Sequence, residues 1–190
     1  NLDKISKGEI HQGVISEIIL PPILNEDSFV NSIATCDQKL MILMLDSVQD
    51  PRNLGACLRS ANAAGVTHVV VNKDGSAPIN SLVHRTSAGA LNSLQIFHVT
   101  NLSRTIKQIK KRDIWVVGLD GGTQSSLYDV NLKGSIAIVV GSEGKGIRPL
   151  IKKTCDQVVS IPMSGNVESL NVSVATAVTL FEIKRQRERP

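Results

Sequence analysis

Aromatic side chains are scarce in this chain of 190 residues, which has three Phe, one Trp and one Tyr, or 3% of the sequence. Proteins that bind single-stranded nucleic acid often stack its bases on exposed aromatic rings. So few rings disfavour a stacking platform of that kind. The sequence therefore encodes any contact with RNA only weakly.

Cysteine and histidine are too few and too scattered to indicate a metal site. Cys36, Cys57 and Cys155 form no CxxC pair and no cluster with the four histidines, which disfavours zinc. Three widely spaced cysteines are typical of reduced thiols in a cytosolic protein. We therefore expect a cytoplasmic protein that needs no metal.

Long apolar runs are also lacking. The apolar runs at residues 40–45 and 136–140 are far shorter than the ~18 residues that a membrane helix needs. No signal peptide or lipidation motif is visible, so we expect no membrane association. The chain starts at Asn1 and not at Met, which indicates a fragment with a segment missing in front.

The charge balance decides little, because the formal net charge is only +4 at pH 7. Such a surface is compatible with nucleic acid and equally with a small-molecule substrate. The length favours a single domain, which can bury roughly 70% of its unfolded surface. A hydrophobic content of 42% fits a globular α/β protein.

Short apolar runs alternate with helical patterns from Lys39 onward. Strands are expected at residues 40–45, 68–71, 94–99, 114–119, 136–140 and 158–161. Helices are expected from Asn53, as N-cap, to Gly65, and at residues 80–88, 101–112, 149–154 and 170–187. Alternation of this kind implies right-handed βαβ crossovers. The predicted fold is α/β, a mostly parallel sheet with helices on both faces.

The first 35 residues are less regular. Residues 14–20 are expected to form a strand that Pro21 and Pro22 end, and residues 25–28 a polar loop. We interpret residues 1–35 as a lead-in that packs on a main domain of residues 36–190.

Loops of small and polar residues follow three strands, at residues 46–52, 141–146 and 164–169. Ligands bind at the carboxyl ends of the strands in parallel α/β sheets. The loop GSEGKG is not a Walker A loop, since Lys145 precedes Gly146, and it is not GxGxxG. NTP hydrolysis and nicotinamide cofactors are thus disfavoured. Its glycines permit backbone groups to read an adenine edge, although a plain tight turn stays open.

Two charged residues near these loops allow several interpretations. Arg59 lies in an otherwise apolar helix, where it either reaches solvent or is held for a phosphate or carboxylate. Glu143 either pairs with Arg59, accepts a hydroxyl proton or is a solvated loop carboxylate.

Three motifs together resemble those of the SpoU/TrmH family of RNA ribose 2′-O-methyltransferases, in the SPOUT class. They are Asn53-Leu54-Gly55 through Arg59-Ser60-Ala61, then Val140-Gly141-Ser142-Glu143-Gly144 with Gly146, and Ile161-Pro162-Met163 through Ser169-Leu170-Asn171-Val172-Ser173-Val174-Ala175. The similarity runs over residues 40–187. HQG at residues 11–13 and LGACLRSANAAGV at residues 54–66 are most similar to bacterial members that methylate a guanosine ribose in 23S rRNA.

The resemblance implies a C-terminal trefoil knot, S-adenosylmethionine bent within that knot, and a homodimer with the active site near its interface. It also implies that residues 1–35 lead in from a missing N-terminal RNA-binding domain to the SPOUT catalytic domain, residues 36–190. Cofactor contacts, largely through backbone, are carried over to Gly141, Ile161 and Leu170. The polar residues around the methyl acceptor are carried over to Asn53, Arg59, Glu143, Ser169, Asn171 and Ser173.

The reaction that the resemblance implies is attack of a ribose 2′-OH on the methyl group of a sulfonium. Its leaving group is neutral, so in-line placement and loss of the hydroxyl proton are the tasks that remain. A guanidinium pKa above ~12 argues for Arg59 as a phosphate clamp and electrostatic stabiliser. Asn53, Ser169 and Asn171 would shape the site, and Glu143 would hold Arg59 or the ribose.

Other functions remain open at this point. They are methylation of tRNA by the same chemistry, another α/β enzyme with a nucleotide cofactor, and a non-catalytic RNA-binding or ribosome-assembly factor. The polar motif residues argue against the last. The basic C-terminal end either contacts RNA or complements a helix dipole; it comprises Lys184, Arg185, Arg187 and Arg189.

Overall fold

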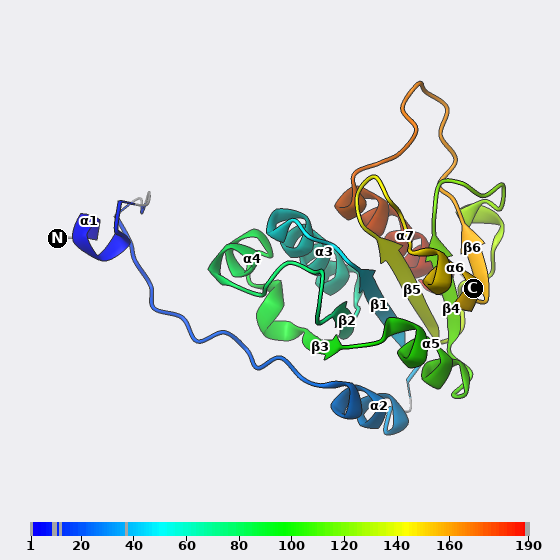
Figure 1. The fold of residues 1–190 in the computed structure, drawn as a ribbon, viewed down its shortest axis with the longest axis horizontal. Helices are drawn as coiled ribbons and strands as arrows, with labels where there is room; N and C mark the ends of the chain where they lie inside the picture. The colour runs from blue at the N-terminus through cyan, green and yellow to red at the C-terminus, as the bar shows by residue number, and fades with distance from the viewer. Residues whose placement is uncertain (1, 9–10, 12, 37, 189–190) are drawn as a thin grey trace.

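A six-stranded sheet, parallel at every pairing, forms the centre of the protein in a computed structural model that describes residues 2–8, 11, 13–36 and 38–188. The strands lie in the order β3-β2-β1-β5-β4-β6 (Figure 1). They are β1 (Met41–Asp46), β2 (His68–Asn72), β3 (Gln95–Val99), β4 (Trp115–Leu119), β5 (Ile136–Gly141) and β6 (Gln157–Val159). The six strands and the parallel sheet expected from the sequence are confirmed.

The central strands are buried on both sides because helices cover both faces of the sheet. Every residue of β1, β2 and β5 is buried, as expected for parallel strands with continuous apolar runs. Alternate side chains of each strand enter two separate hydrophobic clusters, so that Leu43 and Leu45 lie in one and Ile42 and Met44 in the other. This confirms the prediction of helices on both faces.

The first face is covered by α3 (Pro51–Ala64) and α7 (Val172–Glu188), with α4 (Ser81–Thr86) and η1 (Ala90–Ser93) beside α3. Leu54 and Leu58 of α3 and Leu180 and Ile183 of α7 enter the cluster on this face. The helix α3 ends at Gly65, whose φ of 90° is one that glycine adopts without strain.

The predicted N-cap of α3 at Asn53 is wrong. The N-cap lies three residues earlier, at Asp50, and the helix begins at Pro51; Asp50 Oδ1 accepts a 2.8 Å hydrogen bond from the Arg52 backbone N–H. Pro suits the first helical position because it has no N–H to satisfy. The correction matters for function, since the side chain of Asn53 is not used as a cap.

The second face is covered by α2 (Glu26–Ala34), α5 (Leu102–Lys110) and α6 (Pro149–Thr154). Each of these helices packs a side chain into the second cluster: Phe29 from α2, Ile106 from α5 and Ile151 from α6. The polar loop expected at residues 25–28 is wrong, because Asn25 is an N-cap whose Oδ1 accepts a hydrogen bond from the Ser28 N–H. The polar residues Glu26 and Asp27 are the first turn of α2, where acidic side chains suit the helix dipole.

The segment before α2 runs away from the sheet to the short helix α1 (Leu2–Ser6) (Figure 1). Residues 14–20, all of them described, form no strand. Val14 and Ile19 are 74% and 96% exposed, and among the described residues no strand pairs with this stretch. Closer to α2, Leu24 bridges to Phe97 of β3. The expectation of a strand and of a packed lead-in therefore fails for residues 14–19.

Candidate active site

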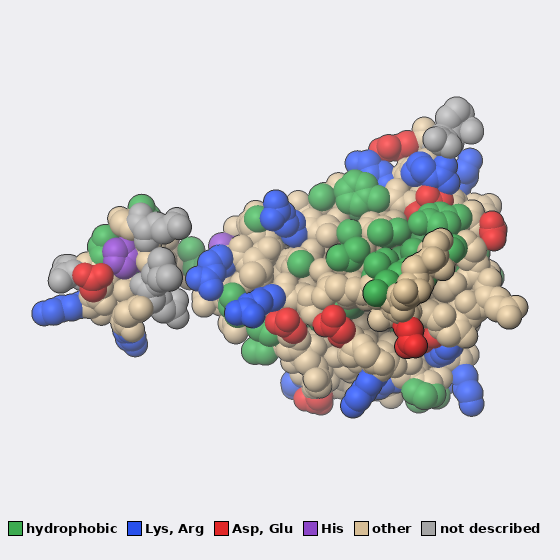
Figure 2. All heavy atoms as spheres, turned by 90° about the horizontal axis from the view of Figure 1, so that it is seen from above, with side chains coloured by type: hydrophobic (Ala, Val, Ile, Leu, Met, Phe, Trp, Pro, Cys, Tyr) green, Lys and Arg blue, Asp and Glu red, His purple; other side chains and the backbone are tan. Residues whose placement is uncertain are grey.

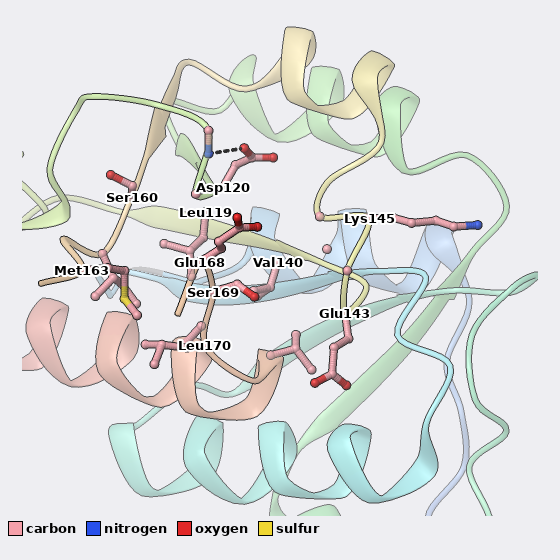
Figure 3. A pocket seen from close by; sticks show the side chains of 18 of the residues that line it. Leu119, Asp120, Val140, Glu143, Lys145, Ser160, Met163, Glu168, Ser169 and Leu170 are labelled. Atoms are coloured by element: carbon pink, nitrogen blue, oxygen red, sulfur yellow. Dashed lines mark hydrogen bonds between the residues drawn. The ribbon is translucent and has the colours of Figure 1, made fainter. Parts of the chain in front are cut away.

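A cavity of about 700 Å³ opens where the carboxyl ends of β4, β5 and β6 meet. It is lined by the loop after β4, the turn after β5, and residues 160–170 after β6 (Figure 3). Gly141, Ile161 and Leu170 all lie on its wall. The three residues that the family resemblance assigns to the cofactor are thus brought to one place.

The turn after β5 packs directly against the strand that it leaves. Gly146 returns to Ser142 through a 2.9 Å backbone hydrogen bond and adopts a positive φ of 64°. A Cβ on Gly141 would lie 2.0 Å from the backbone carbon and oxygen of Gly146. Only glycine therefore fits at position 141, where the turn closes against the strand and Gly141 lines the cavity.

Beside the cavity, four polar side chains form a hydrogen-bonded cluster that we call the amide cluster: Asn53, Glu143, Asn171 and Ser173. Asn53 Nδ2 donates to Glu143 Oε2 at 3.0 Å. Asn171 Nδ2 donates to Asn53 Oδ1 at 3.0 Å and to Glu143 Oε1 at 3.3 Å. In Figure 3 the side chain of Glu143 points from its turn toward the adjacent ends of α3 and α7.

Ser173 decides the orientation of the Asn171 amide. The Ser173 backbone N–H and hydroxyl both donate to Asn171 Oδ1, at 2.9 and 2.7 Å. The amide nitrogen, which can only donate, must therefore face Asn53 and Glu143. Each of the two Glu143 carboxylate oxygens accepts one amide hydrogen bond, and these bonds hold the carboxylate beside the start of α7.

Arg59 does not join the amide cluster. It is exposed on α3, and among the described residues it makes no hydrogen bond or ion pair. Of the three interpretations of Glu143, pairing with Arg59 is not found among the described residues; its carboxylate accepts hydrogen bonds from Asn53 and Asn171 instead. Ser169 is exposed on the cavity wall. The guanidinium of Arg59 is free to receive an anion from solvent.

Sequence reasoning missed Asp120, which lines the cavity from the loop after β4. Its Oδ1 accepts hydrogen bonds from the Gly122 N–H and from Lys152 Nζ, both at 2.9 Å. Burial opposes ionisation of Asp120, but these hydrogen bonds and the Lys152 charge outweigh it and lower the pKa of the carboxyl. Asp120 directly follows a strand that the sequence predicts, and ligands bind at the carboxyl ends of such strands. This position could have identified Asp120 as a site residue.

The wall of the cavity fits an adenosine that carries a cationic chain. Gly141 and residues 160–163 and 167–170 line the cavity, where their backbone groups are available for hydrogen bonds, and Leu119, Val140 and Leu170 supply apolar surface. Carboxylates outnumber cations on this wall, with Asp120, Glu143 and Glu168 against Lys145. Figure 3 shows Lys145 pointing out of the cavity. Such a wall attracts a ligand with positive charge.

Neither a metal nor a thiol nucleophile has an evident place here. No group of three or more His, Cys, Asp or Glu among the described residues could hold a metal ion. Burial raises the pKa of the Cys57 and Cys155 thiols to about 11, so neither is a thiolate at neutral pH.

The basic C-terminal end is largely engaged within the protein. Arg185 donates to both carboxylate oxygens of Glu182, at 2.6 and 2.7 Å. Arg187 donates to the backbone oxygens of Leu40 and Gly134, and burial lowers its pKa. Lys184 lies 3.7 Å from Glu188, and Arg189 lies outside the described residues. Arg187 therefore ties α7 to the residues that precede β1 and β5, whereas Arg185 and Lys184 pair within α7.

Among the described residues, no helix has the length and hydrophobicity that crossing a membrane requires.

A model of the SpoU rRNA Methylase family matches residues 40–181. The chain is 48% identical over 187 residues to the 23S rRNA (guanosine-2'-O-)-methyltransferase RlmB of Haemophilus influenzae, covering 98% of this chain and 76% of that protein. Its identity to the RlmB of Escherichia coli is 46% over 186 residues, with 98% and 76% covered.

Solved structures of similar fold carry the same family names. The SpoU methyltransferase AviRb from Streptomyces viridochromogenes, in complex with AdoMet, is 27% identical with a TM-score of 0.76. That match covers 82% of this chain and 64% of the AviRb chain. The A. aeolicus TrmH/SpoU tRNA modifying enzyme is 29% identical with a TM-score of 0.73, and the match covers 86% of this chain and 84% of that one.

Proposed function

Because this chain belongs to the SpoU rRNA methylase family, we propose that it transfers a methyl group from S-adenosylmethionine to the ribose 2′-OH of a guanosine in 23S rRNA. One observation carries the proposal: the cavity bounded by Gly141, Ile161 and Leu170 lies beside the amide cluster of Asn53, Glu143, Asn171 and Ser173. The guanosine and the rRNA come from the names of relatives that are 46–48% identical.

S-adenosylmethionine, when bound, supplies an electrophilic methyl group on a sulfonium whose departure needs no acid. The backbone at Gly141, Ile161 and Leu170 would hold its adenosine part. Asp120 and Glu168 line the same cavity and favour a cation over a neutral ligand. We propose that the chain forms a trefoil knot around this cavity, in support of which the segments after β4, β5 and β6 all line it.

The amide cluster would place the ribose. Glu143 receives two amide hydrogen bonds in the free protein, so its carboxylate is preorganised and needs little rearrangement when RNA binds. Ser169 adds a hydroxyl on the cavity wall. These groups orient the 2′-OH for in-line attack, which is the largest task that the reaction leaves to the protein.

Arg59 would bind the phosphate next to the acceptor ribose. Its side chain is exposed and has no protein partner in the described structure, and a guanidinium recognises phosphate by two parallel hydrogen bonds. Its contribution is the stabilisation of negative charge as the hydroxyl loses its proton.

A homodimer would complete the enzyme. Val174, Val178 and Phe181 recur on one side of α7 at helical spacing, and Val174 and Phe181 are 47% and 46% exposed. Figure 2 shows hydrophobic side chains gathered on the face that carries α7. An apolar stripe of this kind indicates a protein interface, and a second copy of the chain is the partner that we propose.

Two parts of the proposal concern the whole protein. Residues 1–35 would lead in from an N-terminal RNA-binding domain to the catalytic domain of residues 36–190; this chain spans 76% of the length of the H. influenzae relative. The enzyme would act in the cytoplasm on ribosomal RNA.

Methyl transfer to defined transcripts tests the proposal. The protein is incubated with S-adenosylmethionine labelled in the methyl group and with 23S rRNA or tRNA transcripts, and the 2′-O-methyl nucleotides are mapped. We expect label at one guanosine of 23S rRNA. Label on tRNA alone would show that tRNA and not 23S rRNA is the substrate. If no RNA is methylated and S-adenosylhomocysteine does not bind, the proposed function is wrong.

A further inference from the structure

Asp46 is a fully buried carboxylate at the end of an otherwise apolar strand, with 0% of its surface exposed. Arg148 supplies three contacts to it. The Arg148 backbone N–H donates to Oδ2 at 2.9 Å, and its Nε donates to Oδ1 at 2.7 Å. The second guanidinium nitrogen lies 2.7 Å from Oδ1. Both carboxylate oxygens are therefore fixed in direction.

The pair joins the two segments that carry the amide cluster. Asp46 lies opposite Gly141 in the sheet register, and the chain leads from it through Asp50 to Asn53 on α3. Arg148 is the first residue after the turn that bears Glu143. The contact between Asp46 and Arg148 thus spans the same two segments as the hydrogen bond between Asn53 and Glu143.

The turn is held on its other flank by Asp120. That carboxylate accepts a hydrogen bond from the Ile147 backbone, and one of its oxygens lies 3.0 Å from where a Cβ on Gly146 would be. Asp120 also lines the cofactor cavity, whereas neither Asp46 nor Arg148 does. Asp46 can therefore influence Glu143 without touching the cofactor.

Stability alone is a poor explanation for this pair. The carboxylate of Asp46 is fully desolvated, whereas the side chain of Arg148 is 52% exposed. The desolvation of Asp46 offsets much of the attraction, and well-packed apolar side chains often stabilise a protein equally. Two carboxylate oxygens accept hydrogen bonds in fixed directions and so fix the orientation of the segment that donates to them. Apolar side chains do not. The pair holds the backbone of Arg148 as well as its side chain.

We propose that Asp46, acting through Arg148, is a positioning residue for methyl transfer, which holds the 142–147 turn so that Glu143 meets Asn53 and Asn171. The inference rests on the proposed function of the same site. Displacement of a reacting or orienting group by about 1 Å can cost about 10²-fold in rate. Loss of the pair should therefore lower kcat more than it lowers binding.

The test compares Asp46→Asn with Glu26→Gln. Glu26 forms a similar pair with Arg104, through contacts of 2.6 and 3.2 Å, on the opposite face from the amide cluster. For Asp46→Asn we expect kcat on the RNA that wild type methylates to fall at least about tenfold. The KM for RNA and the Kd for S-adenosylhomocysteine should stay within about twofold. Glu26→Gln should lose stability and keep kcat.

A second readout needs no catalysis. The side-chain amide resonances of Asn53 and Asn171 in a ¹⁵N spectrum, assigned with Asn53→Asp and Asn171→Asp, should shift in Asp46→Asn and stay in place in Glu26→Gln. If Asp46→Asn fails to fold, Arg148→Lys replaces it, because Lys keeps the positive charge but loses the forked contact; it should show the same separation of kcat from binding.

Three results would overturn the inference: kcat of the tested variant within about twofold of wild type, unmoved Asn53 and Asn171 resonances, or an equal loss of kcat in Glu26→Gln. A wild-type protein that methylates no RNA would instead defeat the proposed function, and the amide resonances would still report whether Asp46 positions the turn.

Discussion

The side-chain amide of Asn171 donates to Asn53 Oδ1 at 3.0 Å, although 118 positions separate the two residues in the sequence. The contact joins the first turn of α3 to the start of α7, the two helices that pack side by side on one face of the sheet. Glu143 completes the triangle from the turn after β5. Three distant motifs thus meet in one hydrogen-bonded unit.

Asn171→Ala should affect stability and catalysis together. Asn171 Oδ1 accepts from the Ser173 N–H at the start of α7, and loss of a helix cap costs about 1 kcal/mol. Glu143 would also lose one of its two donors, so kcat for RNA methylation should fall about tenfold or more. Urea unfolding and single-turnover kinetics measure the two effects. The exposed Asn62 on α3 serves as control, and Asn62→Ala should change neither.

Arg59→Ala should leave the cofactor site intact and remove turnover. Arg59 is absent from the cavity wall, so the Kd for S-adenosylhomocysteine should change little. Loss of one electrostatic contact to the transition state lowers kcat by about 10². Lys107, an exposed cation of α5 on the opposite face, controls for the loss of charge alone. Wild-type turnover in Arg59→Ala would remove the residue from the mechanism.

Local pattern was sufficient for the sheet but not for its edges. The runs that became β1 and β5 are buried on both sides, and continuous apolar sequence indicates that directly. The stretch at residues 14–20 is also rich in apolar residues, although Ser16 and Glu17 interrupt it, yet Ile19 is 96% exposed. A strand requires a neighbour with free hydrogen-bonding groups, and sequence pattern does not tell whether one is near.

The site was predictable in its members and less so in its contacts. Small-residue loops after strands identified the cavity wall, and the family resemblance supplied Asn53, Glu143 and Asn171. Their mutual hydrogen bonds span 28 to 118 positions and depend on how α3 and α7 pack. Asp46 was hidden for the same reason, since its partner lies 102 positions away.

Gly141→Ala should abolish binding of S-adenosylhomocysteine. The added Cβ would lie 2.0 Å from Gly146 backbone atoms, so the turn must move away from β5. Overpacking of this kind typically costs about 1–3 kcal/mol, and the displaced turn forms part of the cavity wall. Calorimetric titration measures the affinity. Gly134→Ala is the matched control, because a Cβ there meets nothing within 4 Å; equal weakening in both would contradict the role of Gly141.

Acid should destabilise the protein partly through Asp120. Its folded pKa is lowered from the ordinary 3.8, so its contribution to stability is present above that value and is lost as pH falls through the lower folded pKa. Asp120→Asn should therefore reduce the difference in urea midpoint between pH 6 and pH 3. Asp74→Asn, which removes an exposed carboxyl of the same charge, is the control variant with which the effect of Asp120→Asn is compared. A steeper pH dependence in Asp120→Asn would have the wrong sign.

Phe181→Asp should separate the proposed dimer into monomers. Phe181 is 46% exposed on the outer side of α7, in line with Val174 and Val178 at helical spacing. A carboxylate placed in an apolar contact between two copies must be desolvated without a partner, which is strongly unfavourable. Sedimentation velocity measures the mass, and unfolding measures whether the monomer is still folded. Leu150, which is 63% exposed on α6, provides the control, since Leu150→Asp places the same charge on the other side of the sheet.

We expect a dimer for wild type and Leu150→Asp and a folded monomer for Phe181→Asp. A wild-type monomer, or a Phe181→Asp dimer, would exclude this face of α7 as the interface.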